Sequence, residues 1–102
     1  MIEADTMREI MLALSKDGHQ VFRGNVMQLY TQDGRPVRSG LPVGFSDLFG
    51  FTLDLRPFFL EVKTATGRPT LHQLNFLEAM RARGAIAAIV RSVEDARKLL
   101  AQ

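Results

Sequence analysis

The chain has 102 residues, of which 46% are hydrophobic and 24% are charged, and its formal net charge is +2. These values fit one globular domain with its own core rather than a disordered or membrane-spanning chain. The absence of cysteine excludes disulfides and thiolate metal sites, so any metal must be held by oxygen or histidine ligands.

The N-terminal residues Met1–Asp5 carry acids where a signal peptide needs a basic region followed by an apolar core. We therefore expect a cytoplasmic protein. Ten of the thirteen basic residues are arginine, the side chain best suited to bidentate phosphate contacts. This bias permits nucleic-acid binding, although a solvated surface of mixed charge explains it at least as well.

A first helix is predicted from Glu3 to about Lys16, where Asp17 and Gly18 end it. Its apolar residues recur at helical spacing, at Met7, Ile10, Met11 and Leu14. Glu3 falls on the same stripe, which points its side chain toward the core side of the helix. An acid in the first turn also interacts favourably with the helix dipole, so both interpretations of Glu3 stay open.

Extended structure is predicted next, at Val21-Phe22 and from Val26 to Tyr30, with a hairpin turn at Asp33-Gly34. We interpret residues 31–44 as an exposed loop. Two short strands are then predicted at residues 48–55 and 58–64, separated by a turn near Arg56-Pro57.

A second helix is predicted over residues 70–83, where Gly84 closes it. A buried strand at residues 85–91 leads to a last helix that Ser92 caps. The element order is α-β-β-β-α-β-α. It predicts an α/β fold in a single domain, residues 1–102, with a mixed β-sheet flanked by helices.

The strand at residues 58–64 places Glu61 and Lys63 on one face, because side chains alternate along a strand. A carboxylate and an ammonium therefore point into the same space. An ion pair on an edge strand is the ordinary explanation for such a pattern. The apolar residues before Glu61 instead suggest a buried central strand, in which charges without a use are costly.

Asp47 follows Gly44-Phe45-Ser46 and stands where the chain enters a strand. It is either a turn-capping residue or the main carboxylate ligand of a divalent cation. Mg²⁺ suits a site made of Asp47, Glu61 and the backbone carbonyl of Val62. This ion prefers oxygen ligands, keeps several waters and commonly takes one or two carboxylates plus phosphate oxygens.

Gln73 shares a face of the second helix with Phe76 and Leu77, so its amide points toward the core side and needs a polar partner. Thr70 and Gln73 also fit a capping box, and the two roles are compatible. We interpret His19 and His72 as surface residues. The sequence carries no Ser-His-Asp constellation, P-loop or dinucleotide fingerprint, which leaves hydrolysis by metal-activated water as the expected chemistry.

Over nearly its whole length the sequence resembles the virus-type replication-repair nuclease (VRR-NUC) family, a branch of the PD-(D/E)XK nuclease superfamily. The resemblance rests on Glu3, Arg23 and Asn25 of an Arg-x-Asn motif, Gly-x-Ser-Asp ending at Asp47, Glu61-Val62-Lys63, Gly67-Arg68, Gln73, and residues 84–95. Family members often carry glycine two residues after the Arg-x-Asn motif, where this chain has Met27.

The resemblance implies a restriction-endonuclease-like core in which Asp47 and Glu61 bind the metal and Lys63 lies near the attacking water. Glu3 and Gln73 are implied to support this site. The activity implied is a Mg²⁺-dependent DNA endonuclease that hydrolyses phosphodiester bonds, with Mn²⁺ as an alternative ion. The residues expected to contact DNA are Arg35, Arg38 and Arg68, in loops beside the site, and Arg23 and Asn25.

Stand-alone members of the family resemble Holliday junction resolvases, which act as homodimers on branched DNA. The resemblance therefore implies a homodimer in DNA repair, in a bacterial or phage-infected cell. Apolar residues available for such a contact are Leu12, Met27, Leu29 and Tyr30. Two alternatives remain open, a nuclease for ordinary duplex or single-stranded DNA and a non-catalytic DNA-binding module on the same fold.

Overall fold

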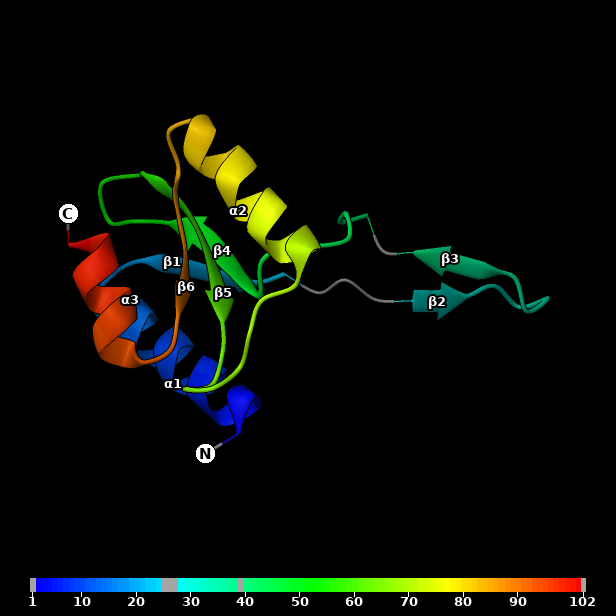
Figure 1. Cartoon of the computed structure of the whole chain (residues 1–102), viewed down its shortest axis with the longest axis horizontal. Helices are drawn as coiled ribbons and strands as arrows, with labels where there is room; N and C mark the ends of the chain where they lie inside the picture. The colour runs from blue at the N-terminus through cyan, green and yellow to red at the C-terminus, as the bar shows by residue number, and fades with distance from the viewer. Residues whose placement is uncertain (1, 25–27, 39, 102) are drawn as a thin grey trace.

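A mixed sheet of four strands forms the body of the protein, in a computed structural model that describes residues 2–24, 28–38 and 40–101 (Figure 1). In sheet order the strands are β1 (Gln20–Arg23), β4 (Leu48–Phe51), β5 (Pro57–Val62) and β6 (Ile86–Val90). The β1–β4 and β4–β5 pairs are antiparallel, and the β5–β6 pair is parallel. The predicted α/β fold with a mixed sheet flanked by helices is confirmed.

Three helices accompany the sheet: α1 (Glu3–Lys16), α2 (Leu71–Ala82) and α3 (Val93–Leu100). α1 and α2 begin and end within two residues of the predicted bounds, and α3 begins directly after Ser92, as predicted. The N-terminal caps explain two of these starts, because the side chains of Thr70 and Ser92 accept hydrogen bonds from the backbone N–H groups of Gln73 and Asp95. Among the described residues no helix has both the length and the apolar character needed to cross a membrane.

The main core lies between one face of β5 and the helices α1 and α3. Its buried side chains are Ile10, Leu14, Leu48, Phe58, Leu60, Val62, Val90, Ala96 and Leu100. On β5 these residues occupy alternate positions, so Phe59, Glu61 and Lys63 must face the other way. That opposite face carries α2, as the contact between the Phe59 and Phe76 rings shows, with centroids 5.5 Å apart.

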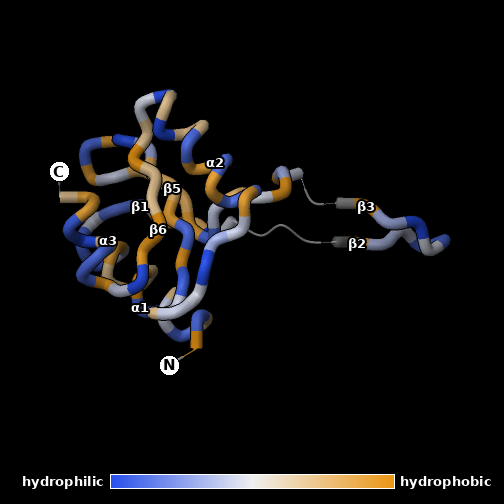
Figure 2. Tube along the Cα trace, in the orientation of Figure 1, coloured by the Kyte–Doolittle hydropathy of each residue, from blue (hydrophilic) through white to orange (hydrophobic). Residues whose placement is uncertain are grey.

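Between β1 and β4 the chain forms a separate antiparallel hairpin of β2 (Gln28–Tyr30) and β3 (Pro36–Arg38), which projects from the body (Figure 1). Figure 2 shows that the tip of this hairpin is hydrophilic. The predicted turn at Asp33-Gly34 is confirmed, but residues 36–38 are a strand and not part of an exposed loop. Val26 and Met27, the first residues of the predicted second strand, lie outside the described residues.

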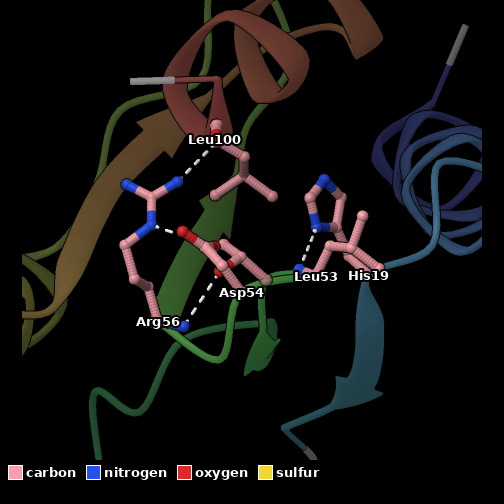
Figure 3. A network of polar contacts seen from close by, with 6 residues as sticks. His19, Leu53, Asp54, Arg56 and Leu100 are labelled. Carbon is pink, nitrogen blue, oxygen red and sulfur yellow. Dashed lines mark hydrogen bonds and ion pairs between the residues drawn. The ribbon is translucent and has the colours of Figure 1, made fainter.

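The turn between β4 and β5 joins distant parts of the chain (Figure 3). The Arg56 side chain donates a hydrogen bond to the Leu100 carbonyl at 3.0 Å and lies 3.2 Å from the Asp54 carboxylate. His19 Nδ1 accepts a hydrogen bond from the Leu53 N–H at 3.0 Å. His19 is half-buried, and its ring is held by a turn 34 residues away in the sequence.

The edge of the sheet at β6 carries one further side-chain contact. Within the described part of the chain β6 pairs only with β5, so its other edge is not covered by a strand. Arg81, near the end of α2, donates a hydrogen bond from Nε to the Ala87 carbonyl at 3.0 Å. A guanidinium therefore occupies one of the acceptors on this edge.

Candidate functional site

Asp47 links the beginning of β4 to the end of β5. Its Oδ2 atom accepts a hydrogen bond from the backbone N–H of Val62 at 2.9 Å, across 15 residues of sequence. The N–H and C=O of one strand residue point to the same side. The Val62 carbonyl therefore faces the side on which Asp47 lies. The turn-capping interpretation of Asp47 is wrong, because the hydrogen bond of its side chain reaches Val62 on the neighbouring strand β5.

The residues before Asp47 explain its fixed position. Gly44 has φ +90°, and a Cβ placed there would lie 2.5 Å from the carbonyl oxygen of His72 at the start of α2. Glycine is thus required both by the backbone conformation and by the close approach of α2. Ser46 is fully buried and donates a hydrogen bond from its hydroxyl to the Leu48 carbonyl at 2.8 Å.

Glu61 is a buried carboxyl group with one unsatisfied oxygen. Its residue is only 1% exposed, and its Oε1 atom accepts a hydrogen bond from Gln73 Nε2 at 2.9 Å. Its Oε2 atom is buried and has no hydrogen-bond partner among the described residues. Burial, the nearby Asp47 carboxyl and the more weakly acting Glu3 raise the pKa of Glu61 to about 8, against the lowering effect of Lys63.

Gln73 performs both roles that its sequence position predicts. Its Oε1 atom accepts a hydrogen bond from the Thr70 N–H at 2.8 Å, and the Thr70 hydroxyl accepts one from the Gln73 N–H at 3.2 Å. The capping box is therefore confirmed. The same amide uses its nitrogen to hold Glu61, so the start of α2 and the position of the carboxyl group are tied together.

Lys63 and Glu3 complete the cluster without forming ion pairs. Lys63 follows β5 on the Glu61 face, and Glu3 begins α1 close enough for its charge to raise the pKa of Glu61. Within the described residues neither side chain has an oppositely charged partner within 4.0 Å. The edge-strand ion pair is thus wrong as an explanation of Glu61 and Lys63, since β5 is a central strand.

This donor set suits a divalent cation that prefers oxygen. The free oxygen of Glu61, the Asp47 carboxylate and the Val62 carbonyl lie at one end of β5. The described residues contain no group of three or more His, Asp or Glu side chains arranged to hold a metal ion. Two carboxylates with a carbonyl match Mg²⁺, which commonly takes few protein ligands and keeps waters. The unsatisfied, buried Oε2 atom indicates that the site is incomplete without a further partner.

A solved structure described as a VRR_NUC domain has the same fold. It matches with a TM-score of 0.68 and 26% sequence identity, and the match covers 98% of this chain and 95% of that one. This likeness supports a VRR-NUC domain. The fold of the chain is accordingly restriction-endonuclease-like, and the match supports a nuclease-family domain. No protein-family model matches the sequence, and no curated protein matches it either.

The basic residues singled out in the sequence lie in different parts of the VRR-NUC domain. Arg68 is exposed in the loop between Lys63 and α2, where it lines a surface hollow with Arg91. Arg35 and Arg38 belong to the β2–β3 hairpin, so their expected place in loops beside the site is wrong. Arg35 is ion-paired with Asp33 at 3.0 Å. Arg23 is exposed at the end of β1, and Asn25 lies outside the described residues.

Sequence reasoning missed Arg91 of this VRR-NUC domain. Its Nη1 atom donates hydrogen bonds to the carbonyls of Thr64 and Gly67, the latter at 2.8 Å. It thereby fastens the loop that follows Lys63 to the end of β6. These partners lie 27 and 24 residues away, so no local pattern could reveal the contact.

Proposed function

We propose that this VRR-NUC domain is a Mg²⁺-dependent DNA endonuclease that cuts branched DNA in the manner of a Holliday junction resolvase. The observation that carries the proposal is the buried Oε2 atom of Glu61, unsatisfied beside Asp47 and the Val62 carbonyl. A cation at this position would satisfy that oxygen and favour the ionised form of a carboxyl group whose pKa is raised to about 8.

Asp47, Glu61 and the Val62 carbonyl are the proposed ligands of the ion. When bound, Mg²⁺ supplies an activated water and neutralises charge on the phosphate that is attacked. Mn²⁺ prefers similar oxygen ligands and is proposed as an alternative ion.

The remaining side chains of the cluster are proposed to orient reacting groups. Lys63 has no carboxylate within 4.0 Å among the described residues, so its ammonium is available to orient the attacking water or to stabilise the developing negative charge. Gln73 holds Glu61 in place through its amide nitrogen. Glu3 contributes negative charge to the ligand cluster and favours cation binding there.

We propose further that the domain acts in DNA repair as a cytoplasmic homodimer, because paired cuts in a junction require two active sites. Three of the four apolar residues considered for this contact are described and exposed, with Leu12 at 67%, Leu29 at 47% and Tyr30 at 70%. Met27 lies outside the described residues. Arg23 and Asn25 are proposed to contact DNA near the site, and Arg35 and Arg38 to contact it from the projecting hairpin.

Cleavage of labelled four-way junction, flap, duplex and single-stranded DNA tests the proposal, with Mg²⁺, Mn²⁺ or a chelator present. We expect symmetric, metal-dependent cuts in the junction, lowered by about 100-fold or more in Glu61→Gln. Glu94→Gln is the matched control, because Glu94 is an exposed acid on α3.

Three outcomes would contradict parts of the proposal. Equal cleavage of duplex or single strands would favour the alternative nuclease. Binding without cleavage under either metal would favour the non-catalytic DNA-binding module. Undiminished cleavage by a folded Glu61→Gln variant would remove Glu61 from the proposed site.

A further inference from the structure

The guanidinium groups of Arg68 and Arg91 have no carboxylate partner within the described residues, although the backbone N–H of Arg91 donates a hydrogen bond to Asp95 Oδ2 at 2.9 Å. Five arginines there form ion pairs with acids, namely Arg8, Arg35, Arg56, Arg81 and Arg97. Arg68 makes no hydrogen bond or ion pair within the described residues, and Arg91 uses only Nη1 of its side chain. The Nε and Nη2 donors of Arg91 therefore remain available to a ligand.

These two guanidinium groups border the same hollow. The hollow has a volume of about 650 Å³. It is lined by Ala65, Thr66, Gly67, Arg68, Pro69, Leu74 and Arg91. No acidic residue is among them, so its charge is set by the two arginines. A hollow with two unpaired guanidinium groups and no carboxylate favours an anion.

The hollow adjoins Lys63 through Gly67. A Cβ placed at Gly67 would lie 3.6 Å from the Cδ atom of Lys63, an ordinary contact distance, and 3.0 Å from the Thr64 hydroxyl oxygen. The loop that lines the hollow therefore lies against the Lys63 side chain.

We propose that this hollow binds a backbone phosphate that neighbours the scissile one, through Arg68 and the free donors of Arg91. The inference rests on the proposed function for its ligand, a nucleic-acid strand. Guanidinium groups match the geometry of phosphate oxygens, and such contacts fix a strand without reading its sequence. Because Arg91 also fastens the loop after Lys63, a phosphate bound here would be held at a set position relative to Lys63.

The salt dependence of DNA binding tests this site in the full-length protein. A labelled four-way junction is titrated with Arg68→Ala and Arg91→Ala in a chelator, so that no cleavage occurs. We expect each variant to lower the slope of log affinity against log salt by about 0.9 and to weaken binding by about 10-fold. Arg83→Ala is the matched control, because Arg83 also lacks an acidic partner and lies at the other end of α2.

Arg91→Ala can also loosen the loop, and Arg68→Ala separates the two effects because Arg68 has no hydrogen bond or ion pair to lose within the described residues. If both variants bind like Arg83→Ala, the phosphate site is wrong. It is also wrong if only Arg91→Ala weakens binding, since Arg91 would then act through the loop alone. One uncharged methylphosphonate at the contacted linkage of the junction should weaken binding by the unmodified protein. It should not weaken binding by either variant any further.

Cleavage measured separately distinguishes this inference from the proposed function. Cleavage by the unmodified protein with unchanged slopes in both variants would overturn the phosphate site alone. The two variants could lower the slope of log affinity against log salt while the unmodified protein cleaves no DNA with Mg²⁺ or Mn²⁺. That result would support the phosphate site and overturn the proposed nuclease activity. Failure of the unmodified protein to bind any DNA would overturn both.

Discussion

Glu61 is buried and lies beside the Asp47 carboxyl group, two features that disfavour its negative charge. A carboxyl group with a pKa of about 8 is mostly protonated at neutral pH. A bound cation would stabilise the charged form and release that proton. Both the stability of the metal-free protein and its affinity for a cation are therefore expected to depend on pH.

The metal-free protein should become less stable as pH rises from about 4.5 to 8. The pKa of Glu61 is raised from 4.5 to about 8 on folding, so the folded state binds more protons than the unfolded state in this range. Its contribution is complete below pH 4.5 and is lost as pH rises to 8, on the order of 4 kcal/mol. Urea unfolding in a chelator at pH 5 to 8 measures this loss.

Glu61→Gln is expected to flatten this profile, because an amide does not titrate. Mg²⁺ should restore stability to the unmodified protein at pH 8 and have little effect on the variant. Asp17, Asp33 and Asp54 have a pKa lowered from 3.8. Their titration therefore does not change the stability measured between pH 5 and 8. Parallel profiles for the two proteins would contradict the raised pKa.

Gln73→Ala should cost more activity than Thr70→Ala at similar stability. Each change removes part of the capping box, which costs about 1 kcal/mol. Only Gln73→Ala also removes the hydrogen bond to Glu61, so we expect it to lower cleavage by about 10-fold. Thermal unfolding and initial cleavage rates compare the two variants. Equal activities would show that Gln73 acts only on the helix.

At the scale of elements, the site depends on the approach of α2 to the segment before β4. Gly44 permits this approach, because a Cβ there would meet the His72 carbonyl. Gly34, in the hairpin turn, has a similar φ of +85° but open space around the same position. Comparing substitutions at the two glycines therefore distinguishes the cost of backbone strain from the cost of a collision with α2.

We expect Gly44→Ala to destabilise the protein by about 3 kcal/mol and Gly34→Ala by about 1 kcal/mol. Both substitutions force a side chain into a positive φ, and only the first adds a collision. Chemical unfolding measures both values. If the two losses were equal, the packing of α2 against Gly44 would not contribute to stability.

The elements that sequence predicted best are those whose signal is local. The periodicity of α1 and the capping box of α2 lie within a few residues, and both predictions are confirmed. The strand at Pro36–Arg38 was missed because three residues are too few to show an alternation of apolar and polar side chains. Its pairing with β2 identifies it as a strand. His19 and Arg91 were missed because their partners are distant in sequence.

The whole molecule has an uneven shape, with extents of 47 × 33 × 26 Å and a hairpin outside the body (Figure 1). A two-stranded hairpin is marginally stable by itself in water. Tyr30 and Val37 of this hairpin are 70% and 45% exposed. Burial of these apolar side chains against a second copy would stabilise the hairpin.

Light scattering should therefore find two copies of the chain at assay concentration, and Tyr30→Asp should weaken their association by about 10-fold or more. Leu53→Asp is the control, because Leu53 is 72% exposed but lies in the turn between β4 and β5. A monomer for the unmodified protein would remove the homodimer from the proposal and leave the individual site intact.

The contact between Arg81 and the Ala87 carbonyl bears on solubility as well as on packing. An uncovered edge strand of small and branched apolar residues, such as Ile86–Val90, is a template onto which other chains add strands and grow fibrils. A guanidinium that occupies an edge acceptor places positive charge where an incoming strand would have to bond. The last turn of α2 is thus expected to disfavour edge-to-edge addition of another strand at β6.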